Sequence, residues 1–149
     1  MLGINKLVKD VIIDDTEIKS LLGYTATDNR VYGFYAPKDI IYNDSKPACI
    51  IFKIHFGKRA VNYSYPLQYP NVFIYFRVLS ISQLNREQVS DRLLQLFDQK
   101  YNLQNDEFTV KFSEIGNYAD GVVEGTPTKP IYAKNISVKF NSVFRLIEE

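Results

Sequence analysis

One stretch of the chain, residues 72–97, decides the fold. It reads Val-Phe-Ile-Tyr-Phe-Arg-Val-Leu-Ser-Ile, then Ser-Gln-Leu-Asn, then Arg-Glu-Gln-Val-Ser-Asp-Arg-Leu-Leu-Gln-Leu-Phe. Its first part has the alternation of a strand, with Val72, Ile74, Phe76 and Val78 at the even positions and mostly apolar residues at the odd ones. A strand that is apolar on both faces is typical of the centre of a sheet that is covered on both sides.

The second part of this stretch predicts a helix whose N-cap is Asn85. Gln88 follows three residues later, as a capping box requires, and Leu84 and Val89 have the spacing of a hydrophobic staple. Apolar residues recur at helical spacing and predict one buried face: Val89, Leu93, Leu96 and Phe97. A central strand that leads directly into a packed helix is typical of an α+β domain.

The length and charge of the chain limit its class. A chain of 149 residues predicts one domain, residues 1–149, and a net charge of +1 gives no field that favours nucleic acid or an anionic membrane. Residues 1–10 lack the apolar core of a signal peptide, and no apolar run is long enough to span a bilayer. We therefore expect a soluble protein that is made in a cytoplasm and has no membrane partner.

The rest of the chain predicts further helices and strands. Residues 4–23 have helical spacing in two pieces, with Asp15 or Thr16 as the second N-cap and Gly23 as the stop. Strands are expected at residues 31–35, 50–56, 59–65, 107–115 and 131–144, the second and third forming a hairpin that turns at Gly57 and Lys58. Residues 116–130 read as a long loop. The expected fold is α+β, a largely antiparallel (mixed) sheet of about five or six strands flanked by two helices.

No pattern in the sequence predicts catalysis. His55 is the only histidine and Cys49 the only cysteine. We expect the two to face opposite sides of one strand, which disfavours a catalytic dyad. Cys49 precedes an apolar run and is expected to be a buried thiol. The sequence has no zinc-ligand spacing and no phosphate-binding glycine loop. We therefore expect no enzyme, no metal and no cofactor.

A small basic patch surrounds the predicted hairpin turn, and several tyrosines lie in predicted loops. The patch consists of Lys53, His55, Lys58 and Arg59. The tyrosines are Tyr63, Tyr65, Tyr69 and Tyr118. Basic residues interleaved with aromatic ones can bind single-stranded nucleic acid, whereas a mixed-charge hairpin with aromatic neighbours suits contact with another protein. Aromatic loop residues can also anchor a loop to its own domain, so these alternatives stay open.

Three stretches resemble the tail-terminator and tail-completion proteins of long-tailed bacteriophages. The first is Asp-Thr-Glu-Ile-Lys-Ser-Leu-Leu-Gly at residues 15–23, followed by Arg-Val-Tyr-Gly at residues 30–33 and by Pro37. The second is Pro-Ala-Cys-Ile-Ile-Phe at residues 47–52, a proline that leads into a long strand. The third is the strand, polar link and amphipathic helix of residues 72–97. Together they touch most of the chain.

The resemblance implies a structural assembly protein of a virion. Such proteins form a hexameric ring at the head-proximal end of the tail tube, stop tube polymerisation and join the tail to the head. The implied partners are further copies of this chain, the tail tube protein and a head connector or stopper protein, while DNA passes through the ring without sequence-specific binding. Interface residues are expected among Lys58, Arg59, Tyr63, Tyr65, Tyr69 and Tyr118. Another neck protein, for head completion or stopping, and a small nucleic-acid-binding module that uses residues 53–59 are the alternatives.

Overall fold

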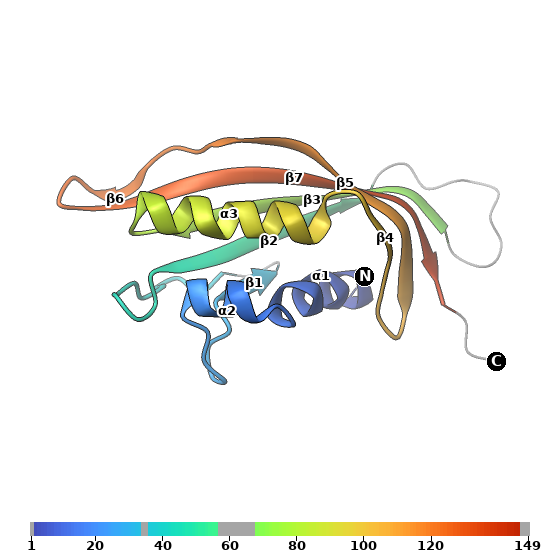
Figure 1. Cartoon of the computed structure of the whole chain (residues 1–149), viewed down its shortest axis with the longest axis horizontal. Helices are drawn as coiled ribbons and strands as arrows, with labels where there is room; N and C mark the ends of the chain where they lie inside the picture. Colours follow the sequence, from blue (N-terminus) through green and yellow to red (C-terminus); the bar gives the residue numbers. More distant parts are fainter. Residues whose placement is uncertain (1, 34–35, 57–67, 147–149) are drawn as a thin grey trace.

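The computed structural model describes residues 2–33, 36–56 and 68–146, and a seven-stranded sheet is its largest part (Figure 1). The elements in chain order are α1 (Leu2–Ile13), α2 (Thr16–Leu22), β1 (Val31–Gly33), β2 (Ala48–Phe56), β3 (Gln68–Ser80), α3 (Gln83–Phe97), β4 (Lys100–Gln104), β5 (Phe108–Asp120), β6 (Glu124–Thr126) and β7 (Lys129–Arg145). The sheet order is β1-β2-β3-β7-β5-β4, and β6 pairs with β7. Among the described strands, β1 and β2 pair in parallel and all other neighbours pair antiparallel. The predicted α+β class with a mixed, largely antiparallel sheet is therefore confirmed.

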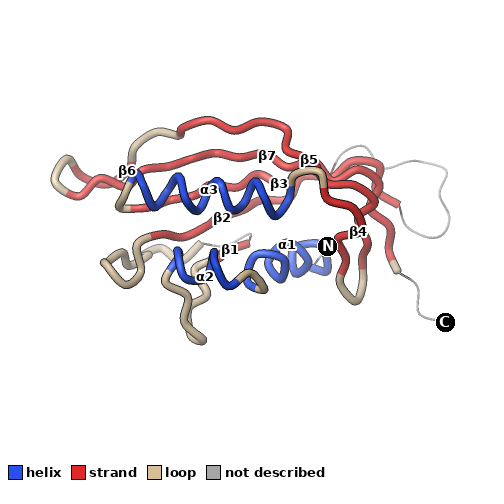
Figure 2. Tube along the Cα trace, viewed as in Figure 1, coloured by secondary structure: helices blue, strands red, loops and turns tan. Residues whose placement is uncertain are grey.

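The helices and one face of the sheet enclose the main core (Figure 2). Even positions of β3, from Val72 to Val78, are buried, as the alternation predicts. Phe76 lies against Phe52 of β2 and Phe97 of α3, with ring centroids 5.8 and 5.2 Å apart. Phe97 in turn lies 6.2 Å from Phe140 of β7. This run of aromatic contacts joins α3 to three neighbouring strands, so the stretch of residues 72–97 is central to the core.

The opposite face of β3 differs from the prediction. Its odd positions are not covered by a second layer of helices, and Tyr75 at the centre keeps 49% of its surface exposed. Among the described residues, Ile40 and Tyr42 cover one end of this face, where they pack against buried Cys49, Leu79 and Ala133. The prediction of a strand covered on both sides is wrong because Tyr75 and Arg77 place polar groups among the apolar odd positions. We call the uncovered area the open face.

The starts and ends of the helices follow local capping, with one correction. Asp15 caps α2 by accepting a hydrogen bond from the Ile18 amide at 3.0 Å, and Gly23 ends α2 in the left-handed conformation at a φ of 77°, as predicted. The N-cap of α3 is Ser82 and not Asn85. Asn85 lies in the first turn, where its side chain donates to the Leu21 carbonyl at 2.9 Å and accepts from the Ser80 hydroxyl at 2.8 Å. Asn85 therefore joins α3 to α2 and to β3.

Several predicted strand boundaries also change. Residues 116–130, predicted as a loop, form the end of β5, all of β6 and the start of β7, and residues 100–104 form β4. These strands were not predicted because many of their side chains face solvent, so their sequence is polar and rich in glycine and reads as a loop. The predicted strand at residues 59–65 lies outside the described residues. Within them, β2 pairs antiparallel with β3 along its whole length, from Ala48–Ser80 to Phe56–Val72.

Candidate functional site on the open face of the sheet

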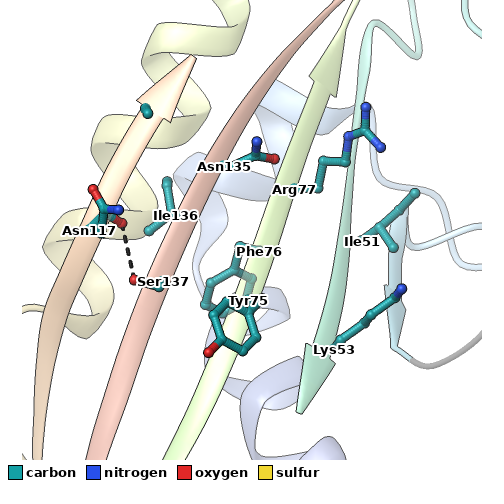
Figure 3. Close-up of a pocket in the computed structure, with 10 residues that line it drawn as sticks. Ile51, Lys53, Tyr75, Phe76, Arg77, Asn117, Asn135, Ile136 and Ser137 are labelled. Atoms are coloured by element: carbon teal, nitrogen blue, oxygen red, sulfur yellow. Dashed lines mark hydrogen bonds between the residues drawn. The ribbon is translucent and has the colours of Figure 1, made fainter. Parts of the chain in front are cut away.

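A shallow groove of about 650 Å³ lies on the open face (Figure 3). Its lining comes from four neighbouring strands, β2, β3, β7 and β5. The side chains that give it character are Lys53, Tyr75, Arg77, Asn117, Asn135 and Ser137. Aromatic, amide, hydroxyl and cationic groups thus meet on one surface, which suits a polar or mixed partner better than a small apolar ligand.

The register of the strands explains why these side chains meet. Lys53 and Ser137 are the partners of Tyr75 on its two sides, and Asn135 is the partner of Arg77. Directly opposite residues project from the same face of a sheet, so each cross-strand row places its members side by side. The Ser137 hydroxyl also lies 3.4 Å from the Asn117 carbonyl, which ties β7 to β5 beside the groove (Figure 3).

The charges in the groove are partly compensated. Arg77 forms an ion pair with Glu124 of β6 at 2.6 Å, while its Nε is buried and has no hydrogen-bond partner. Lys53 is exposed, and no described residue forms an ion pair with it. Among the described residues that line the groove, Lys53 is therefore a cation without an ion-pair partner, and Arg77 Nε is a buried donor whose hydrogen bond is not satisfied.

A segment held by a buried arginine closes one end of the open face. Arg30 is fully buried and donates to the carbonyls of Ala48 and Lys46 at 3.0 and 3.3 Å, and its guanidinium lies over the Tyr42 ring at 5.4 Å. Asp28 accepts from Arg30 at 3.4 Å and from the Tyr32 hydroxyl at 2.8 Å. Burial, followed by the hydrogen bond to Asp28, raises the pKa of Tyr32 to about 12. This network holds Tyr42 beside Arg30 and so fixes residues 40–42, the covering segment at this end of the open face.

The single cysteine and the single histidine of the sequence lie far apart along β2. Cys49 is buried and lies 3.4 Å from the Tyr42 hydroxyl, and burial raises the pKa of its thiol. His55 is exposed at the other end of β2. The expectation that they face opposite sides is wrong: six residues is an even spacing, so both project from the open face. Six residues of a strand span about 20 Å, however, so the two form no dyad.

Absences of two further kinds of site can be stated only for the described ranges. Within residues 2–33, 36–56 and 68–146, no three His, Cys, Asp or Glu side chains lie where they could hold a metal ion. None of the described helices is long and apolar enough to cross a bilayer.

The predicted interface residues fall into two groups. Lys58, Arg59, Tyr63 and Tyr65 lie outside the described residues. Tyr69 lies in β3, where its backbone pairs with Val143. Tyr118 lies in β5 with 57% of its surface exposed, so of the predicted set it is the exposed aromatic residue that the structure describes.

Tyr118 belongs to a charged cluster on the helix side of the sheet. The Lys134 ammonium lies 5.6 Å from the centre of the Tyr118 ring and forms an ion pair with Glu87 of α3 at 3.0 Å. Arg86 pairs with Glu87 at 2.8 Å and with Asp120 at 3.5 Å. The hydrogen bond from Lys134 lowers the pKa of Glu87 although burial opposes it. This cluster fastens the start of α3 to β5 and β7.

Sequence reasoning missed most of the groove. Tyr75 and Arg77 could have predicted the groove, because a phenol and a guanidinium at odd positions of a strand indicate a face that contacts water or a partner. Asn117 and Asn135 could not have been assigned to the groove. Asn117 lies in a predicted loop, and Asn135 lies on a strand whose neighbours could not be predicted.

Comparisons with known proteins show that a solved structure shares this fold. No known protein family and no curated protein matches the sequence. Among solved structures, a chain described as "Virion of native gene transfer agent (GTA) particle" matches with a TM-score of 0.61 at 7% identity, over 97% of this chain and 96% of that one. A second structure matches over 97% and 96% at 12% identity with a TM-score of 0.46, which is too low to support an argument. The chain therefore shares a fold, over nearly its whole length, with a component of that particle.

Proposed function

We propose that this chain is a structural protein of a phage-like virion. The observation that carries the proposal is the shared fold over 97% of the chain with a component of a gene transfer agent virion. The resemblance of residues 15–23, 30–33, 47–52 and 72–97 to phage tail-terminator proteins supports the same class independently of that fold. The protein is not an enzyme in this proposal, since Cys49 and His55 are separated along β2.

Within this class, the finer proposal is a tail terminator. Copies of the chain form a hexameric ring at the head-proximal end of the tail tube, where the ring stops tube polymerisation and offers its other side to the head connector. A ring of this kind needs two different patches on each copy, which join head to tail and close. A head-completion or stopper protein is the alternative within the class.

The proposed interface includes exposed aromatic residues and a basic segment. Tyr118 is exposed beside a free strand edge, and exposed Tyr side chains are frequent anchors of protein interfaces. Tyr69, Tyr63 and Tyr65 are proposed as further anchors, and Lys58 and Arg59 are proposed to face the tube, a neighbouring copy or the passing DNA.

A second candidate function is binding of single-stranded nucleic acid. The specific observation that favours it is the position of Lys53 and His55, two members of the predicted basic patch, on the open face. Lys53 is the register partner of Tyr75, and His55 is the partner of Phe73. Cations beside exposed aromatic rings can hold a phosphate backbone while bases stack. Salt-dependent binding of an oligonucleotide would favour this candidate.

Light scattering combined with negative-stain electron microscopy tests the finer proposal. We expect closed rings with a central hole wide enough for duplex DNA when the protein is concentrated or supplied with its tail tube. Replacing both Tyr63 and Tyr65 with Ser is expected to leave the monomer folded and to abolish the rings, whereas Tyr24→Ser, in the connector after α2, is expected to leave them intact. Monomers that neither form rings nor bind the end of a tail tube would overturn the tail-terminator proposal.

A further inference from the structure

The second half of β5 forms an open edge of the sheet. β4 pairs with β5 only at residues 109–113, and no described strand lies beyond residues 116–120, which form the upper border of the sheet in Figure 1. All five of these residues are exposed. The unpaired edge begins after Ile115, because the Ile115 amide still donates a hydrogen bond to the Asp98 side chain at 3.3 Å. We call residues 116–120 the β5 edge.

The backbone of the β5 edge presents groups that can pair with another strand. The Gly121 amide donates to the Ala133 carbonyl at 2.9 Å, and Ala119 and Asn117 are the register partners of Asn135 and Ser137. Hydrogen-bonded pairs alternate with non-bonded pairs along an antiparallel ladder. The amide and carbonyl groups of the residues between them, Tyr118 and Asp120, therefore point away from β7 toward the open side.

The β5 edge lacks most of the features that prevent strand addition. Edge strands in soluble proteins are commonly protected by Lys, by Pro or by a covering helix. Residues 115–121 read Ile-Gly-Asn-Tyr-Ala-Asp-Gly and contain neither Lys nor Pro. A bulge between Ile115 and Asn117 marks the start of the edge, and beyond it the pairing with β7 is regular to Asp120. About 17 Å of strand is thus open to a partner.

The charges around this edge favour one kind of partner. In the adjoining cluster the anions are exposed and the cations are covered: the side chains of Asp120 and Glu87 are 64% and 40% exposed, whereas those of Arg86 and Lys134 are 11% and 13% exposed. An approaching chain therefore meets carboxylates first. Complementary charge selects partners and orients them more than it adds affinity, so a cationic segment is favoured.

The described edge strands of this chain are poor candidates for that partner. β4 carries a single cation, Lys100, and β1 carries none. We therefore infer that the β5 edge binds an extended segment of a second protein that carries Lys or Arg, and that this segment adds to the sheet as a further strand beside Tyr118 and Asp120. Strand addition uses main-chain hydrogen bonds for affinity and side chains for selection. This inference rests on the edge and its charges and is independent of the proposed function.

Amide exchange measured by NMR on the full chain, with two synthetic peptides, tests the inference. One peptide alternates Thr and Val with Lys at both ends, and its twin has Glu at both ends. We expect the Lys peptide to bind about tenfold more tightly than the Glu peptide at low salt, because two favourable surface pairs replace two repulsive ones. Its binding is expected to slow exchange at the Tyr118 and Asp120 amides, and the preference is expected to shrink as salt is added.

Two variants at one position separate backbone pairing from side-chain contact. Tyr118→Pro removes an outward amide without removing a hydrogen bond to β7 and is expected to weaken the Lys peptide at least about tenfold. Tyr118→Ser keeps the amide and is expected to bind more tightly than the Pro variant. If the Pro variant does not fold, Asp120→Asn serves instead and is expected to reduce the preference for the Lys peptide.

Three results would overturn the inference. Equal binding of the two peptides would remove the charge argument. Binding without protection of Tyr118 and Asp120 would show a different site. Protection of these two amides that rises with protein concentration alone would show that a second copy of this chain occupies the edge.

Discussion

Arg30 is a fully buried cation that directly precedes β1, and its backbone has a φ of 62°. Its guanidinium donates to the Ala48 and Lys46 carbonyls and to Asp28, so one side chain joins the segment before β1 to the start of β2. Burial opposes ionisation of Asp28, yet the hydrogen bonds from Tyr32 and Arg30 lower the pKa of that carboxyl. The covering segment over one end of the open face is thus held by a polar network as well as by apolar packing.

Replacing Arg30 with Met tests this network. The change removes the guanidinium donor of the Ala48 and Lys46 carbonyls and one of the donors to Asp28, so we expect the free energy of unfolding to fall by about 3 kcal/mol. Urea denaturation followed by circular dichroism measures the loss. Lys53→Met is the matched control, because Lys53 is exposed, and it is expected to change stability by no more than about 0.5 kcal/mol. Equal stability of the two variants would show that the network contributes little.

The burial of Arg30 could not be predicted from the sequence. The residue lies in a polar connector, and its backbone partners Lys46 and Ala48 follow it by 16 and 18 residues. Nothing local to Arg30 therefore signals its partners. The burial of Cys49, by contrast, followed from its place before an apolar run, and the structure confirms it.

At the scale of elements, Asp15 links two helices. It caps α2 and accepts hydrogen bonds from Arg92 of α3 at 2.6 and 2.8 Å. The hydrogen bond from Arg92 lowers the pKa of Asp15, with a further contribution from the Ile18 amide and with burial opposing both. The charged form of Asp15 is therefore favoured in the folded protein.

This link predicts a pH-dependent contribution to stability. A carboxyl whose pKa is lowered on folding stabilises fully above its unfolded value, near 3.8, and loses the contribution as the pH falls through the folded value. Asp15→Asn keeps a capping side chain but removes the charge, so we expect it to be about 1–2 kcal/mol less stable than the wild type at pH 7. The gap is expected to close below about pH 4.

Urea unfolding of both proteins between pH 2 and pH 7 measures this gap. Asp14→Asn removes the same charge from the neighbouring exposed position and is expected to show almost no gap at any pH. A gap for Asp15→Asn that stays constant on acidification would contradict the assigned role of the Asp15–Arg92 pair.

The element pattern was predictable where apolar periodicity was strong. The strands around Phe52 and Phe76 and the helix that carries Leu93 were confirmed, because each has one face in the core. The extent of β5 and β7 was not predictable, because their outer residues face water and read as a loop. The N-cap of α3 was displaced to Ser82 because tertiary partners occupy the Asn85 side chain.

At the scale of the whole molecule, helices cover one face of the sheet and leave the other face and the β5 edge largely bare (Figures 1 and 2). Such an asymmetric layer gives one chain several surfaces of different chemistry. The sequence predicted the sheet and the α+β fold class, whereas the open face depends on which strands are neighbours. The strand order is set by pairing between residues far apart in the sequence, so no local pattern predicts it.

Tail length in particles made without this chain is the most direct test of the proposed virion role. Electron micrographs of particles from cells in which the reading frame is deleted give the distribution of tail lengths and the fraction of tails joined to heads. If the chain is a tail terminator, its loss is expected to give tails of uncontrolled length that remain separate from heads, and supplying the intact chain is expected to restore normal particles. Particles of normal tail length and normal head attachment in the deletion would contradict the proposal.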